Sequence, residues 1–415
     1  MSIRSGPTGL ADRALGPDLA RGFMLLFIAL ANSHYFLVGS GYFSGFPIDG
    51  SVVDRAVGFL IATFVDGRAF PLFGLLFGYG VAQIVRRQRE AGSGWWSIRF
   101  LLWRRSLVLI VLGFAHAMLL YIGDILAAYG VLLFVGVWAL SWTDRWLFIV
   151  AALVLVLIAQ PSGDTLAGSD DAPDAAMLPP AFLGQFEDRI AVQPYIAGLG
   201  WIGFLTPFLI GLWAGRRRIL ERPAEHLPLL RATAVLGIAI AVVGALPISL
   251  AVGGFIPRPT ADEVMDLGPL HDAAGVFGGF GYAALFALIA HRISGRRSIS
   301  GQGGIDGQGG IDGQGGDRPM VRAIAAVGQR SLTCYLAQSV VWAVVFTPYL
   351  LDLSDTLTTT TTALLALATW LATVWLAERM RRVDHRGPFE VLIRWFSYQP
   401  SRTAATRSRN SGSRA

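Results

Sequence analysis

The sequence predicts an all-α fold, a polytopic transmembrane helix bundle of about ten spans with both termini in the cytoplasm (N-in and C-in). Hydrophobic residues make up 53% of the chain and charged residues only 15%, which leaves too little polar surface to solvate a soluble protein of 415 residues. Apolar runs recur along the chain, and a run of about 17 to 25 residues can cross the roughly 30 Å hydrocarbon core as a helix. The bilayer is therefore the first partner that we expect.

The predicted spans follow the apolar runs in order. The second run is too long for one perpendicular span, so we expect it to break at Asp66-Gly67-Arg68, with an interfacial or re-entrant piece over 57–65 and the crossing helix over 69–84. Gly74 and Gly78 in that helix should let another helix approach closely. The expected spans are 22–38, 57–85, 106–122, 125–141, 146–160, 196–214, 232–252, 271–290, 323–347 and 359–377.

The basic residues, all of them arginine, set the predicted orientation. All except Arg55, Arg68, Arg189 and Arg258 fall on one side of the membrane if the N-terminus is cytoplasmic, and the opposite loops are acidic. This is the positive-inside pattern, and an even number of spans returns the C-terminus to the cytoplasm. The charge is spread over loops that face lipid headgroups rather than gathered in one patch, so the basic pI does not indicate a nucleic-acid partner.

One integral membrane domain is expected over residues 22–398, between a cytoplasmic segment over 1–21 and a disordered cytoplasmic tail over 399–415. Within it, the N-terminal part covers about 13–160 and the C-terminal part about 195–398. They are separated by an extracytoplasmic loop over 161–195, expected to end in a short amphipathic segment over 182–190, and a glycine-rich cytoplasmic linker covers 300–318.

Cys334 is the single cysteine and lies in a predicted span. Without a second cysteine the chain can form neither an intrachain disulfide nor a cysteine metal cluster. We expect neither a metal site nor a bound cofactor. The sequence also lacks a Walker loop, a His-Glu-x-x-His zinc motif and a Gly-x-Ser-x-Gly elbow.

Polar residues within apolar spans are functional candidates, because the bilayer disfavours them unless they meet a partner or water. Asp18, Arg21 and Asn32 share a narrow wedge of the first helix, whereas His34 lies on its opposite side. Asp18 and Arg21 either form an interfacial ion pair or contact a ligand, and Asn32 either bonds another helix or contacts a ligand.

Asp66 and Arg68, near the outer end of the second span, present a similar choice. They either snorkel as a pair to the headgroups or bind substrate.

The third span holds the sharpest signal, His116 in mid-span followed by Asp124. On a regular helix the two would lie about 80° apart, with His116 about 12 Å deeper. An imidazole at that depth is either a general base, since its pKa lies near neutrality, or a buried side chain bonded to a neighbouring helix.

Four segments resemble the domain-of-unknown-function family 418, the YeiB-like bacterial membrane proteins, over residues 13 to about 398. The resemblance implies a multi-pass protein of the bacterial plasma (inner) membrane, with Gln338 among its substrate-binding residues. The segments are Asp18-Leu-Ala-Arg21-Gly22 with Asn32, Arg68-Ala-Phe-Pro-Leu-Phe-Gly-Leu-Leu-Phe-Gly78, Gly113-Phe-Ala-His116 with Gly123-Asp124-Ile-Leu126, and the pairing of Gly328 to Ser339 with Arg386-Gly387-Pro388-Phe-Glu390 and Arg394.

That family is in turn distantly similar to transmembrane acyltransferases of the heparan-glucosaminide acetyltransferase type, which share the Asp-x-x-Arg-Gly opening and the later asparagine. The histidine that follows this span in those enzymes has no counterpart near Phe43 here, so His34 or His116 would have to substitute for it. The resemblance implies an acyl-CoA-like donor.

Two functions remain open from the sequence. An acyltransferase would move an acyl group from a cytoplasmic donor to an extracytoplasmic glycan or small molecule, with His116, Asp124 and Asn32 as catalytic residues and Asp18, Arg21, Asp66, Arg68 and Gln338 binding substrate. A transporter would instead line a substrate path with the same polar residues, and a non-catalytic envelope role is a third reading.

Overall fold

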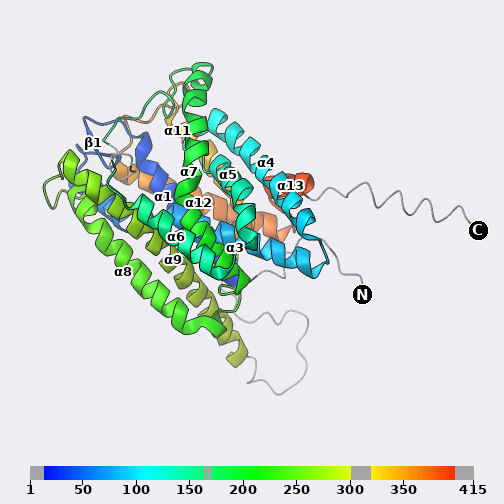
Figure 1. The fold of residues 1–415 in the computed structure, drawn as a ribbon. Coiled ribbons are helices and arrows are strands. Elements are labelled where there is room, and N and C mark those ends of the chain that lie inside the picture. The colour runs from blue at the N-terminus through cyan, green and yellow to red at the C-terminus, as the bar shows by residue number, and fades with distance from the viewer. Residues whose placement is uncertain (1–13, 163–164, 166–169, 301–318, 398–415) are drawn as a thin grey trace, which may run out of the picture.

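The computed structural model describes residues 14–162, 165, 170–300 and 319–397, and these are almost entirely helical (Figure 1). Two two-residue strands, β1 (Tyr42–Phe43) and β2 (Phe46–Pro47), pair antiparallel after the first helix. The helices are α1 (Leu15–Ser33), η1 (His34–Phe36), α2 (Val52–Phe64), α3 (Ala69–Glu90), α4 (Trp95–Leu119), α5 (Leu126–Gly136), η2 (Val137–Ser141), α6 (Asp144–Ile158), α7 (Gly184–Arg216), η4 (Pro223–His226), α8 (Leu227–Val252), α9 (Ala261–Ser300), α10 (Pro319–Gln329), α11 (Ser331–Phe346), α12 (Thr359–Arg382) and α13 (Pro388–Ser397).

Six helical segments of the described chain are long and apolar enough to cross a membrane. Large apolar side chains such as Leu153 on α6 and Val243 on α8 are about two-thirds exposed on the bundle surface, as lipid contact requires. The segments are Leu15–Phe36, Val52–Glu90, Gly184–Arg216, Pro223–Val252, Ala261–Ser294 and Thr359–Arg382, with shorter apolar helices over Leu126–Ser141 and Ser331–Phe346.

The predicted break in the second apolar run is confirmed. α2 ends at Phe64 and α3 begins at Ala69, and Gly67 between them has a φ of +71°, which favours glycine because it has no Cβ. α2 begins at a capping box in which Ser51 accepts from the Asp54 amide and Asp54 accepts from the Ser51 amide, so both ends of this helix are specified locally.

Two predicted boundaries are wrong. The run over 323–347 is not one helix, because the chain breaks at Arg330 between α10 and α11. The segment over 182–190 is not separate, because α7 runs without interruption from Gly184 to Arg216. Arg189 is buried there and donates to the carbonyls of Ala176 and Met118, which anchors the start of α7. The tail over 399–415 and the linker beyond residue 300 lie outside the described residues.

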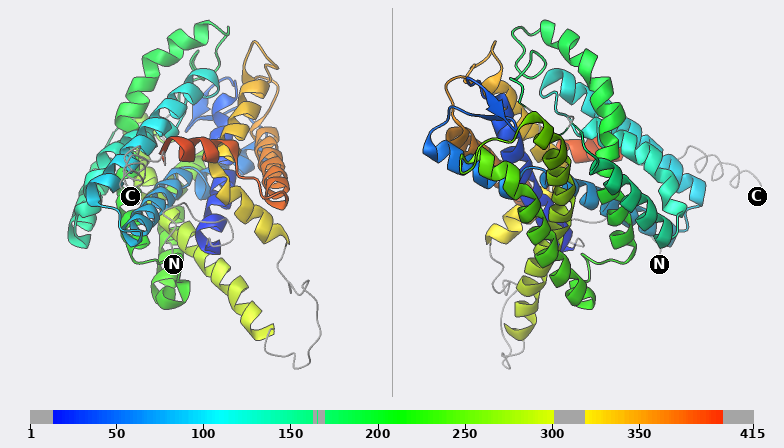
Figure 2. Two further views of the ribbon diagram at one scale, coloured as in Figure 1. Left: turned by 90° about the vertical axis from the view of Figure 1, so that its right-hand side faces the viewer. Right: turned by 60° about the vertical axis from the view of Figure 1, so that its left-hand side comes forward.

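α1 lies at the centre of the bundle and contacts α3, α9, α10, α11 and α12. Around it, α8 pairs with α9, α3 with α7, and α4 with α5. The short helix α13 runs crosswise to these long helices and packs on α4 and α11 (Figure 2). The segments flanking α1 therefore come from both halves of the chain.

The contact between α3 and α7 depends on small residues, as predicted for Gly74 and Gly78. A Cβ at Gly74 would lie 2.9 Å from the Pro207 ring, and one at Gly78 would overlap the Phe208 carbonyl oxygen. Gly211 on α7 makes the reciprocal approach to the Leu75 carbonyl. The two backbones touch directly here, so neither helix can shift without separating the pair.

Gly78→Ala is expected to lower the melting temperature of the purified protein, because the added methyl must displace backbone rather than a flexible side chain. Overpacking of this kind costs about 1–3 kcal/mol. Gly198→Ala on α7 is the matched control, since nothing lies within 4 Å of its added Cβ. Equal melting temperatures for the two variants would show that the α3–α7 contact is looser than described.

Candidate functional site

A buried histidine–aspartate pair lies between α4 and α5. His116 Nδ1 lies 2.8 Å from Asp124 Oδ1, and both side chains are at most 1% exposed. The other carboxylate oxygen, Oδ2, accepts from the Ala127 amide at 2.7 Å, in the first turn of α5. A carboxylate oxygen accepts, so His116 Nδ1 is the donor in this contact.

The pair forms because the chain reverses between its two members. α4 ends at Leu119, and Asp124 lies in the connection that leads back into α5. The expected separation of about 80° and 12 Å on one continuous helix is therefore wrong. Gly113, three residues before His116, makes this contact possible, because a Cβ there would collide with the Ala127 amide nitrogen and with Asp124.

The His116 ring has an aromatic neighbour, Tyr335. His116 Nε2 is buried without a hydrogen-bond partner among the described residues, and its ring lies 5.1 Å from that of Tyr335 on α11. One turn further along α11, the Gln338 amide is also buried, and neither its oxygen nor its nitrogen has such a partner. A buried polar atom without a hydrogen-bond partner costs free energy, and such atoms are typical of a site where a bound ligand supplies the missing partner.

Asn32 lies beside the connection that follows α4, because the Tyr121 hydroxyl donates to its Oδ1 at 3.0 Å. His34 contacts a different group, with Nε2 at 3.7 Å from Asp66 Oδ2 and its ring stacked on Phe46. α1 ends at Ser33 and His34 begins η1, so Asn32 and His34 do not share one continuous helix, and they contact different groups.

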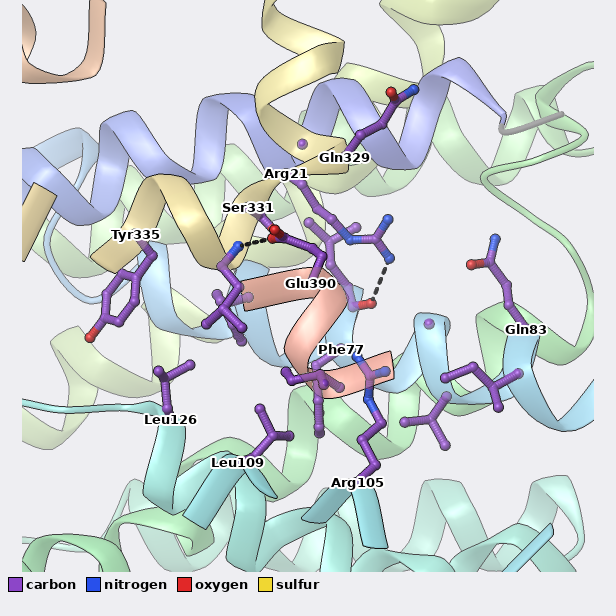
Figure 3. A pocket seen from close by; sticks show the side chains of 18 of the residues that line it. Arg21, Phe77, Gln83, Arg105, Leu109, Leu126, Gln329, Ser331, Tyr335 and Glu390 are labelled. Carbon is purple, nitrogen blue, oxygen red and sulfur yellow. Dashed lines mark hydrogen bonds between the residues drawn. The ribbon is translucent and has the colours of Figure 1, made fainter. Parts of the chain in front are cut away.

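Tyr335 also closes one end of a cavity of about 250 Å³. Figure 3 shows Tyr335 and Leu126 at one end of this cavity and Arg21 and Gln83 towards the other. Four arginines from α1, α3, α4 and α13 line it: Arg21, Arg87, Arg105 and Arg394.

The carboxylates near the cavity already have partners. Glu390 accepts from the Leu332 and Thr333 amides at 2.8 and 3.2 Å, so it caps the start of α11. Glu221 accepts from Arg86 and from Gln83. Burial alone would raise the pKa of the Glu221 carboxyl, but these hydrogen bonds outweigh burial and hold that pKa below its ordinary value. The charged side chains that line the cavity are four arginines and the one carboxylate of Glu390, so its lining is net basic.

Asp18 and Arg21 form the ion pair that was one of their two expected roles, at 3.2 Å, and Arg21 also donates to the Leu76 carbonyl at 3.3 Å. Arg21 lines the cavity as well. The two expected roles of Arg21 are therefore compatible, because the ion pair with Asp18 orients the Arg21 guanidinium at the cavity wall.

Arg68 does not snorkel to the headgroups, because it is fully buried. It donates to the carbonyls of Asp66 and Ala241 and lies 2.9 Å from His271 Nε2, so it ties the α2–α3 junction to α8 and α9. These acceptors take the place of water around the Arg68 guanidinium, so its charge can be buried. Among the residues that the structure describes, no hydrogen bond or ion pair joins this cluster to the His116–Asp124 pair.

The sequence predicted no role for Arg87, Arg105 or Arg394, and it placed Tyr335 only within the segment from Gly328 to Ser339. Arg394 belongs to a segment that carries the family resemblance, and Arg87 and Arg105 fall among the arginines predicted on the cytoplasmic side. Nothing local separates an arginine that lines a cavity from one that faces water, because the cavity is built by helices distant in sequence.

Spanning helices, a buried histidine–aspartate pair and an arginine-lined cavity together define an α-helical membrane protein with a polar site inside its bundle. Residues 214–301 and 312–400 match the family model described as protein of unknown function DUF418. It is also similar to the uncharacterized protein YxaH of Bacillus subtilis (strain 168), with 24% identity over 440 residues that cover 95% of this chain and 97% of that protein.

Proposed function

We propose that this protein is a membrane acyltransferase that moves an acyl group from a cytoplasmic donor to an extracytoplasmic glycan or small molecule. The observation that supports this most directly is His116, whose Nδ1 is held by Asp124 while its buried Nε2 lacks a partner among the described residues. In this proposal the Asp124 carboxylate accepts from Nδ1 and so orients the imidazole with Nε2 as the atom that acts as general base.

In the proposed reaction, His116 Nε2 accepts the proton of an acceptor hydroxyl or amine as that group attacks the acyl carbonyl. The new bond forms at the carbonyl carbon, the bond to the donor's leaving group breaks, and His116 returns the proton to the leaving group. Asp124 stabilises the imidazolium between these steps, and the Asn32 amide nitrogen donates to the carbonyl oxygen.

The donor in this proposal is acyl-CoA-like, with phosphates that Arg21 binds, since a guanidinium matches phosphate geometry. Gln338, buried one turn from Tyr335, contributes a further donor and acceptor to the bound substrate. Arg68 is assigned a structural role instead, because its guanidinium is already bonded to α8 and α9.

His116 and Asp124 form one compact buried pair, and the His116 ring contacts Tyr335, which lines the cavity; this grouping favours an enzyme over a transporter, in which polar residues would follow a continuous path. Metabolite and envelope-glycan profiling of a deletion strain tests this. We expect one acylated species to be lost and its unacylated form to accumulate, both reversed by the wild-type gene. An unchanged acylation profile with altered uptake of a solute would point to transport.

The proposed direction of transfer requires N-in and C-in topology in the bacterial plasma membrane. Asp171→Cys in the acidic loop and Ala224→Cys in an arginine-rich connection, both exposed positions, report it in a Cys334→Ala background. In intact cells, an impermeant thiol reagent is expected to label position 171 and to label position 224 only after permeabilisation. The reverse pattern would place the arginine-lined cavity on the outer face and contradict a cytoplasmic donor.

A further inference from the structure

The arginine-lined cavity has a charged part and an apolar part. Figure 3 shows the ends of the Arg21 and Arg105 side chains apart from an apolar wall that includes Leu109 and Leu126 and leads to Tyr335. Arg394 also lines the cavity. A ligand that satisfies both parts carries an anion at one end and a hydrocarbon or acyl group at the other.

The cavity is too small for a whole molecule of that kind. Its volume of about 250 Å³ is below the roughly 300–1,000 Å³ typical of sites that enclose a drug-sized ligand. Part of a bound amphiphile must therefore remain outside the cavity, and the surroundings of the opening decide where that part lies.

α13 forms one wall of the cavity and has two different faces. Glu390, Ile393 and Arg394 line the cavity. On the other face, Trp395 and Phe396 are 62% and 40% exposed. With ten residues the helix is too short to span a bilayer, and its strongly amphipathic pattern is typical of a helix that lies in the membrane interface.

The neighbouring part of α4 has the same composition. Arg104 donates to the Phe396 carbonyl at 2.6 Å, and the exposed Trp96 and Phe100 lie on the same helix. The Arg99 guanidinium stacks 5.0 Å over the Trp96 ring. Aromatic rings mixed with arginines are enriched where a protein surface meets lipid headgroups.

We propose that α13 and the start of α4 lie in the headgroup layer, and that the arginine cavity takes a phosphate-bearing amphiphile directly from that layer. The phosphate binds Arg105 and Arg394, the chain runs along Leu109 and Leu126 towards Tyr335, and the remainder stays in the leaflet. The inference deepens the proposed function, on which the ligand's role as donor rests, but the binding site itself does not depend on it.

The position of α13 can be measured in liposomes with depth-dependent quenching. Trp395→Cys in a Cys334→Ala background would carry an environment-sensitive fluorophore, with Leu153→Cys on α6 as the deep control and Ala224→Cys as the aqueous control. We expect the fluorophore at position 395 to be quenched more by lipids with a spin label near the headgroup than by lipids with a spin label near the end of the acyl chain. The opposite order is expected at position 153. Quenching of position 395 by aqueous iodide alone would overturn the interfacial placement.

Ligand entry is tested by thermal stability in nanodiscs of neutral phosphatidylcholine, with either added phosphatidylglycerol or inorganic pyrophosphate in solution as the probe. Phosphatidylglycerol is expected to raise the melting temperature of the wild-type protein, with an apparent affinity that Arg105→Gln plus Arg394→Gln weakens about tenfold or more. Arg55→Gln, at an exposed position of α2, should leave that affinity unchanged.

Stabilisation by pyrophosphate but not by phosphatidylglycerol would show that the anion comes from solution, which overturns entry from the leaflet. Stabilisation by neither, or by phosphatidylglycerol without dependence on the two arginines, would overturn the site. His116→Gln is expected to bind phosphatidylglycerol as the wild type does. If His116→Gln loses acyl transfer but still binds phosphatidylglycerol, the binding site stands independently of the proposed reaction. If the two-arginine variant loses binding but acyl transfer continues, the lipid is not the acyl donor.

Discussion

His116→Gln is expected to abolish complementation of a deletion strain while the protein stays inserted and folded. Glutamine keeps hydrogen-bonding capacity but cannot accept and return a proton near pH 7. General acid–base catalysis contributes about 10²–10⁴-fold to rate, so a loss of that size is the expected result once a substrate is known.

Asp124→Asn is expected to act more weakly in the same assay, because the amide keeps much of the contact with His116 but removes the charge that stabilises imidazolium. The variant must be compared at equal protein level, since Asp124 also accepts from the Ala127 amide. His226→Gln is the matched control, because that histidine lies on η4 in the connection between α7 and α8.

A purely structural His116 leads to the opposite outcome. The substitution would then lower the melting temperature, and whatever protein survived would complement fully. Full complementation by His116→Gln at wild-type protein levels would end the proposal that His116 is a general base.

Arg68→Leu is expected to prevent stable folding. The substitution removes the buried guanidinium that donates to the carbonyls of Asp66 and Ala241 and contacts His271 Nε2, and it puts no polar group in its place. A buried hydrogen bond that loses one partner costs about 1–3 kcal/mol, so the loss of several is a large fraction of the stability of a typical domain, about 5–15 kcal/mol.

The measurement is the yield and melting temperature of purified protein, with Arg55→Leu as the control. Arg55 is an exposed arginine on the preceding helix, so its loss should change both little. A stable Arg68→Leu protein without activity would instead restore the substrate-binding role that the sequence suggested for Arg68.

The sequence by itself determined the features that depend on local properties. The length of the apolar runs predicts spanning helices, because a helix must cross a hydrocarbon core of given thickness. The break at Asp66-Gly67-Arg68 was predictable for the same reason, and so was the close approach at Gly74 and Gly78, because only glycine lets two backbones touch. The resemblance to family 418 also rested on the sequence alone, and the model of that family matches residues 214–301 and 312–400.

Only the tertiary structure decided how those segments meet. The chain reversal after Leu119 brings Asp124 onto His116, a contact that no helical spacing shows. Arg330 donates to the His385 carbonyl, and Glu390 caps α11, so two distant segments become one wall of the cavity. Arg68 is buried for the same kind of reason, since its acceptors lie on helices far along the chain. Such contacts depend on the packing of whole helices, whereas periodicity and run length report only on each helix alone.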